Sequence, residues 1–185
     1  MPAACEATGA DDLASRLAAS NVNPQTFLAT DYLNHFNEVV MLLELVAEAP
    51  ELIDELVAWH PRSYPEHFAA SALADRDLAI AAYQAAPACY RRPFDATVTA
   101  MNARVLDAVG RLTAQIEAGD AAARDLAAVV VADLRRLIDC ASAIIHGSVG
   151  TLEQDEIDAL LEGGGGASAT PPAAGAQDAI DALFD

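Results

Sequence analysis

The side chains with the clearest catalytic potential in this chain lie between positions 31 and 38. The segment reads Asp-Tyr-Leu-Asn-His-Phe-Asn-Glu. On a helix, Asn34 and Glu38 are one turn apart, and so are Asp31 and His35. This is the most polar stretch of a helix that otherwise has the pattern of a core helix. Asn34 and Glu38 are therefore the catalytic candidates, and a solvated helix face with an inter-helix hydrogen bond is the alternative interpretation.

The histidine and cysteine residues give only incomplete patterns of a metal site or a nucleophilic triad. His35 with Glu38, and Glu66 with His67, have ligand-like spacing, but the repeated Glu-x-x-His pairs of helical di-iron bundles are missing. No Gly-x-Ser-x-Gly elbow is found in the sequence. We therefore expect no metal, no cofactor and no nucleophilic triad. The histidines and cysteines that could have served these roles are His35, His60, His67, His146, Cys5, Cys89 and Cys140.

The charge of the chain narrows the class of partner. It has 28 acidic residues against ten basic ones, all of them arginine, and a formal net charge of −18. Because lysine is absent, a lysine nucleophile, a Schiff base and a P-loop are excluded. The chain also lacks the basic footprint of a nucleic-acid-binding protein. An acidic protein is instead attracted to a basic patch on a protein partner.

Hydropathy and the N-terminal segment predict the cellular location of the protein. No run of about 18 apolar residues is free of charge, so we expect no membrane insertion. Residues 1–10 lack the basic start and apolar core of a secretory signal. We therefore expect a cytoplasmic protein with reduced thiols.

The elements that must position these residues are predicted to be helices. The chain is 54% hydrophobic and rich in alanine, but only 5% aromatic. A helix is predicted over 30–48, and a short one follows from Pro50. The spacing of Ser63 and Glu66 predicts a capping box, opening a helix that continues to 86 with an interruption near 74–75. The apolar stripe of the 30–48 helix comprises Leu33, Phe36, Val40, Leu43 and Ala47.

Two long helices are predicted over 93–118 and 121–147, with Pro93 at the start of the first. They are joined only by Gly119 and Asp120, so they should form an antiparallel hairpin. The predicted fold class is an all-α helical bundle with a long antiparallel helix hairpin and a flexible C-terminal tail carrying short amphipathic helices.

That tail contains one short acidic sequence twice. A shift of 23 positions superimposes six identical residues of 151–162 on 176–185. In the first copy Ile157, Leu160 and Leu161 form one apolar stripe on a helix, surrounded by acids. Such peptides fold into a groove on a partner, although packing of the first copy on its own domain is the alternative. The predicted division is 1–10 disordered lead, 11–148 helical domain, 151–162 first docking helix, 163–175 Gly/Pro/Ala linker and 176–185 second docking helix.

These two copies, the first acidic repeat (151–162) and the second acidic repeat (176–185), resemble known peptides. The first resembles the N-terminal peptide of the flagellar motor switch protein FliM, which captures the phosphorylated chemotaxis regulator CheY. The second is similar to the same peptide and to the regulator-binding tail of the phosphatase CheZ. Glu153 and Ala176 stand where the family has serine, so a capping hydroxyl is missing. The partner-binding residues that the resemblance implies are Gln154, Asp155, Ile157, Asp158, Leu160, Leu161, Gln177, Asp178, Ile180, Asp181, Leu183 and Phe184.

The resemblance implies a chemotaxis or flagellar signalling protein that binds a phosphorylated CheY-type response regulator. Flagellar switch components are further partners that it suggests, and any Mg²⁺ would belong to the partner's receiver domain. A CheZ-like phosphatase is the alternative. In such phosphatases an amide on the turn next to an acid orients the attacking water, which is the role the resemblance would imply for Asn34 beside Glu38. That family places its acid before the amide, however, and Asn34 precedes Glu38 here. A small-molecule or metal sensor is a third interpretation. A homodimer that joins two hairpins into a four-helix bundle is left open.

Overall fold

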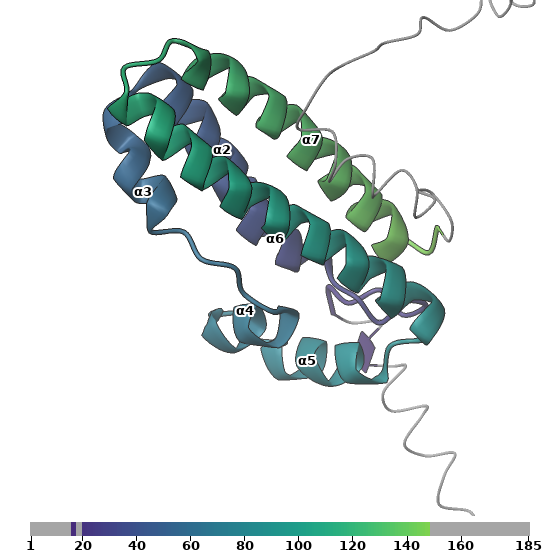
Figure 1. Ribbon diagram of the computed structural model, residues 1–185. Helices are drawn as coiled ribbons and strands as arrows, with labels where there is room; N and C mark the ends of the chain where they lie inside the picture. Colours follow the sequence, from purple (N-terminus) through teal and green to yellow (C-terminus); the bar gives the residue numbers. More distant parts are fainter. Residues whose placement is uncertain (1–15, 18–19, 149–185) are drawn as a thin grey trace, which may run out of the picture.

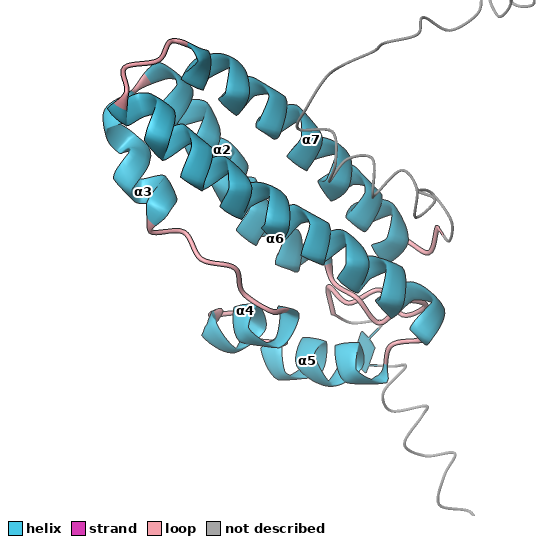
Figure 2. Cartoon of the chain, in the orientation of Figure 1, coloured by secondary structure: helices cyan, strands magenta, loops and turns pink. Residues whose placement is uncertain are grey.

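A computed structural model describes residues 16–17 and 20–148, which form a helical bundle (Figure 1). Figure 2 shows helices joined by loops throughout this part of the chain. The described residues contain no strand beyond an isolated bridge between Val22 and Ala29, so the all-α prediction is confirmed. The elements are η1 (Thr30–Leu33), α2 (Asn34–Glu48), η2 (Pro50–Leu52), α3 (Ile53–Val57), α4 (Tyr64–Ala70), α5 (Arg76–Ala85), α6 (Ala88–Glu117) and α7 (Ala122–Ile145).

The hairpin of α6 and α7 forms the long axis of the bundle. Figure 1 shows the two helices side by side, with α2 packed against α7 and with α3, α4 and α5 along one edge. Helices of 30 and 24 residues extend about 45 and 36 Å at 1.5 Å per residue. None of the helices among the described residues is apolar over a length that would cross a bilayer.

The predicted start of the first long helix was wrong. The helix begins at Ala88, and Pro93 lies inside it rather than at its first turn. The N–H groups of Tyr90 and Arg91 both donate to the carbonyl of Pro87, which closes an additional turn before Pro93. Pro93 is the sixth residue of α6 and has no N–H to donate to the Cys89 carbonyl four residues earlier, so the helix lacks one backbone hydrogen bond there.

Both long helices end at a glycine with a left-handed backbone. Gly119 has a φ of +66° and Gly147 a φ of +93°. At the first end, the N–H of Asp120 donates to the Gln115 carbonyl; at the second, the N–H of Ser148 donates to that of Ala143. These are the bonds by which a glycine cap satisfies the last carbonyls of a helix. The expected turn after the first long helix is therefore present.

The apolar stripes predicted from periodicity form the core. On α2 and the preceding η1, Leu33, Phe36, Val40 and Leu43 are buried, while Ala47 is half-buried. The hairpin contributes buried side chains from both of its helices. They include Phe94, Met101, Val105, Leu112, Leu126, Val130, Leu137, Ala141, Ile144 and Ile145.

The 63–86 region forms two helices. Ser63 caps α4 and Glu66 reaches back to it, so the predicted capping box is present. The chain then leaves the helix at Ala70 and begins the next at Arg76. The expected interruption is therefore real and spans 71–75. This break turns the chain, and α5 packs against α4.

Candidate functional site

Every predicted partner-binding residue lies outside the described residues. This applies to the first acidic repeat, to the linker 163–175 and to the second acidic repeat. The docking prediction therefore stays a prediction. The described part of the chain does fix where the tail departs, because α7 ends at Ile145. There Thr26 Oγ1 donates a hydrogen bond of 2.7 Å to the Ile145 carbonyl and ties the helix end to the 20–29 loop.

The catalytic candidates Asn34 and Glu38 are both exposed on the first two turns of α2. The helix therefore places them as the spacing predicts. Glu38 lines a cleft to which Asn34 does not contribute. The structure thus presents the two groups on one helix without enclosing them together.

The cleft beside Glu38 lies between α2 and the extended segment that joins α3 to α4. Its volume is about 300 Å³. Glu55 and Arg62 bring one further carboxylate and one guanidinium to its wall. The complete lining is His35, Glu38, Leu42, Glu55, Ala58, Trp59, His60 and Arg62.

The wall of this cleft depends on a stacked pair of rings. His35 and Trp59 lie 4.6 Å apart between ring centroids at an angle of 19°. Trp59 Nε1 also donates to the His35 carbonyl at 3.3 Å. These two contacts anchor Trp59, and the loop that carries it, to α2. Tyr90 plays a comparable role at the start of α6, where its hydroxyl accepts a 2.7 Å bond from Gln25 Nε2.

Two imidazoles in this region are neutral at pH 7. Burial lowers the pKa of His35 to about 4, and the nearby Arg62 guanidinium and His67 act in the same direction. Burial, again with Arg62, lowers the pKa of His67. His35 Nε2 and His67 Nδ1 are buried without a hydrogen-bond partner among the described residues. A neutral ring is the form that such surroundings favour.

These rings belong to an aromatic cluster that the sequence did not reveal. Tyr32 is at its centre and contacts the rings of Phe36, Tyr64, His67 and Phe94 at 5.2–5.8 Å. Its hydroxyl donates 2.7 Å to the Arg62 carbonyl. Burial raises the pKa of Tyr32, and the neighbouring acids add to the effect. The cluster holds the 59–63 segment against the bundle.

A second cleft, of about 400 Å³, lies on the α6 side of the same segment. Tyr83 donates 2.8 Å to Asp95 there, and burial together with this carboxylate raises the pKa of Tyr83 to about 12. Asn102 Oδ1, also in the lining, is buried without a partner in the described structure. Arg62 borders both clefts. In the sequence, Arg62 stands out only as part of a Trp-His-Pro-Arg loop.

A groove of about 410 Å³ runs between α2 and α7. Its walls carry two exposed ion pairs, Arg124 with Glu48 at 3.0 Å and Arg135 with Glu44 at 2.6 Å. Its floor consists of small or aliphatic side chains. They are Leu43, Ala47, Ala127, Ala128 and Val131.

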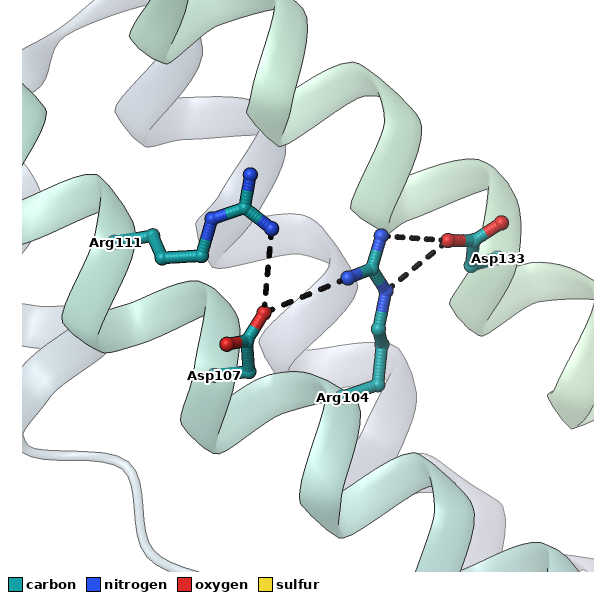
Figure 3. A network of polar contacts seen from close by, with 4 residues as sticks. All are labelled: Arg104, Asp107, Arg111 and Asp133. Atoms are coloured by element: carbon teal, nitrogen blue, oxygen red, sulfur yellow. Dashed lines mark hydrogen bonds and ion pairs between the residues drawn. The ribbon is translucent and has the colours of Figure 1, made fainter. Parts of the chain in front are cut away.

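The α6–α7 hairpin is joined by a buried ion pair. Figure 3 shows Arg104 reaching Asp133 on the opposite helix, with Asp107 and Arg111 continuing the network. The Arg104–Asp133 distance is 2.7 Å, and the Arg104 side chain is only 9% exposed. This arrangement has a structural purpose, which is to align the two helices.

The ligand-like fragments of sequence do not assemble into a metal centre. Across 16–17 and 20–148, no three His, Cys, Asp or Glu side chains are grouped closely enough to hold an ion. His35 points into the aromatic cluster, whereas Glu66 bonds to Ser63. Cys89 is exposed and Cys140 is buried on α7, as expected for a core helix.

Comparison with family models, with curated proteins and with solved structures finds no match to this chain.

Proposed function

We propose that this protein is a chemotaxis or flagellar signalling protein whose acidic repeats bind a phosphorylated CheY-type receiver domain. The observation that supports this most is the repetition itself. Gln, Asp, Ile, Asp, Ala and Leu recur in the same order 23 positions apart. A structural helix needs one such sequence, whereas a tether with two copies increases the effective concentration of a docking peptide.

The distribution of charge supports a tail that acts on another protein. Residues 149–185 contain eight acids and no basic residue, whereas all ten arginines lie between Arg16 and Arg136. An unmixed acidic segment is attracted to a basic surface on a partner and associates faster at low salt. Ile157 and Ile180 would be the central apolar anchors of the two copies.

The test is a titration of the full chain against a CheY-type receiver in the presence and absence of a phosphoryl mimic. Binding should require the mimic. Removing one buried anchor costs about 2 kcal/mol, or roughly 30-fold in affinity, so Ile157→Ala with Ile180→Ala should nearly abolish the complex. Ala179→Ser, between the anchors, is a matched control that should bind normally. Equal affinity for the double variant and the wild type contradicts the proposal.

A CheZ-like phosphatase is the second candidate, favoured by one observation. Asn34 and Glu38 are both exposed and lie one turn apart on α2, accessible to a protein bound by the tail. The rate of receiver dephosphorylation should then increase with the intact protein and return to the spontaneous rate with Asn34→Ala. If the protein binds the receiver and leaves its dephosphorylation unchanged, only the non-enzymatic function remains.

A further inference from the structure

Two exposed apolar side chains lie beside the groove between α2 and α7. They are Met41 (55% exposed) and Leu45 (44%), each one turn along α2 from a carboxylate that lines the groove, Glu44 or Glu48. Apolar surface at the rim of an apolar-floored groove indicates a docking surface.

We propose that the first acidic repeat binds in this groove within the same molecule, and we call the groove the seat of the repeat. The geometry of the groove fits an amphipathic helix with a narrow apolar stripe. Small side chains at Ala47, Ala127 and Ala128 leave room between α2 and α7. Ile157, Leu160 and Leu161 would occupy that room, in the helix-in-groove manner of many peptide complexes.

The charges at the rim complement the acids of the repeat. Arg124 pairs with the exposed Glu48 and also donates from Nε to the Ala47 carbonyl at 3.2 Å, whereas Arg135 pairs with the exposed Glu44. The two arginine side chains are 63% and 61% exposed. Such surface pairs are weak and exchange readily. Arg124 and Arg135 would form ion pairs with acids of the repeat, namely Asp155, Asp158 and Glu162, in competition with Glu44 and Glu48. Because Glu44 and Glu48 also repel these acids, the affinity of the groove for the repeat would be low.

The length of the tail allows this contact in one molecule. From Ile145 the centre of the groove lies about 17 residues back along α7, or about 26 Å. Because the Ser148 N–H is still bonded to the Ala143 carbonyl in the cap of α7, only residues 149–151 can span the distance, by up to about 10 Å. On a helix, the Ile157–Leu161 stripe begins about 9 Å beyond Thr151. The Ile157–Leu161 stripe can therefore lie about 19 to 25 Å from the end of α7 when the repeat runs antiparallel to that helix. This is level with Val131, at the nearer end of the groove and about 21 Å from Ile145. The second repeat is separated by a further 13-residue linker.

The seat would regulate the tail, and this consequence rests on the proposed function. A repeat held in the groove hides the same isoleucine and leucines that the receiver must bury. A seat occupied two thirds of the time would weaken the apparent affinity of that repeat roughly threefold. A weak seat would thus keep the repeat covered until a receiver of higher affinity displaces it.

Methyl NMR on the full chain tests this binding directly, because one methionine lies at the rim of the groove and another lies in the core of the hairpin. Met41 is at the groove rim and Met101 is completely buried in the hairpin. With methyl-labelled methionine, Ile157→Asp should move the Met41 signal by more than its linewidth and leave Met101 unmoved. Ile180→Asp, the matched change in the second repeat, should leave both signals unmoved. The variant Met41→Leu identifies the Met41 signal, because that signal disappears from its spectrum.

An unmoved Met41 signal in Ile157→Asp would overturn the proposal. A shift difference that disappears on twentyfold dilution would also overturn it, because the occupant would then be a second copy of the chain. If instead Ile180→Asp causes the shift, the second repeat is the occupant and the assignment to the first is wrong.

A groove variant separates this inference from the proposed function. Ala128 is exposed, so Ala128→Glu should fold normally and repel the acidic repeat. Its Met41 signal should move as in Ile157→Asp, and its affinity for the activated receiver should increase roughly threefold. Ala103→Glu, exposed on α6 away from the groove, is the control and should change neither. If Met41 moves but no variant or wild-type chain binds the receiver, the seat stands and the proposed function fails.

Discussion

Arg104 on α6 holds one carboxylate oxygen of Asp133 on α7 through two of its nitrogens, at 3.0 and 2.7 Å. The contact joins the two helices of the hairpin near their midpoints. A second oxygen, from Asp107, lies 3.6 Å from another nitrogen of the same guanidinium (Figure 3). Arg104 is therefore a buried cation between two carboxylates, and the hairpin register depends on it.

Removing Arg104 should destabilise the fold. Arg104→Ala leaves Asp133, only 22% exposed, without its cation, and the expected loss is about 3 kcal/mol in the free energy of unfolding. Urea denaturation measures this. Arg111→Ala, which breaks an exposed pair with Asp107, is the matched control and should cost less than about 0.5 kcal/mol. Similar losses in both variants would contradict a special role for the buried pair.

The buried histidines predict acid sensitivity with a defined sign. The pKa of His35 is about 4 in the folded chain, and that of an unfolded histidine is about 6.5. Below pH 6.5 the unfolded state binds more protons, so the stability that this ring contributes is present above that pH and is lost as the pH falls toward 4. The expected slope is up to about 1.4 kcal/mol per pH unit for His35.

Replacing the titrating ring tests that assignment. His35→Phe keeps an aromatic ring beside Trp59 and should flatten the stability profile between about pH 6.5 and 4. At alkaline pH, where the ring is neutral in both states, the difference between variant and wild type should be constant, and this range is the internal control. A wild-type slope in the variant would show that other groups cause the acid sensitivity.

The capping box of α4 should contribute measurably to stability. Ser63 Oγ accepts from the Glu66 N–H, and the Glu66 carboxylate accepts 2.8 Å from the Ser63 N–H. Ser63→Ala removes the cap and should cost about 1 kcal/mol. Ser63→Thr preserves the hydroxyl and should cost much less. Thermal unfolding of the two variants distinguishes a cap from a merely tolerated serine.

Two glycines should respond to alanine with opposite signs. Gly119 has a φ of +66°, where alanine is strained, so Gly119→Ala should destabilise by about 1 kcal/mol. Gly110 lies within α6 with no atom within 4 Å of an added Cβ, so Gly110→Ala should stabilise by about the same amount. Denaturant midpoints measured on the two variants give the comparison. Equal signs would mean that the turn does not hold Gly119 in its left-handed conformation.

The helices were predictable because each has a local signal. The stripe through Phe36, Val40 and Leu43 has the period of a helix, and the Ser63–Glu66 spacing marks a cap. The start of α6 is misplaced by the sequence because Pro93 has the pattern of a first-turn residue. The additional turn depends on bonds to the Pro87 carbonyl, which the residue pattern does not reveal.

The clefts were not predictable because they depend on distant residues. Arg62 borders two of them because the hydroxyl of Tyr32, 30 positions earlier in the chain, donates a hydrogen bond to the Arg62 carbonyl and fixes its position. The sequence favours a structural or surface role for His35 over a metal ligand, but it does not reveal the partner of the ring. Its stacking on Trp59 requires α3 to fold back on α2. The docking assignment rests on sequence alone, since both acidic repeats lie outside the described residues.

Helix α2 forms a wall of two separate hollows, through different sides of its surface. His35, Glu38 and Leu42 face the cleft with the 59–63 segment, whereas Leu43, Glu44, Ala47 and Glu48 face the groove with α7. A ligand in the cleft beside Trp59 and a peptide in the groove beside Arg124 would therefore contact different faces of the same helix.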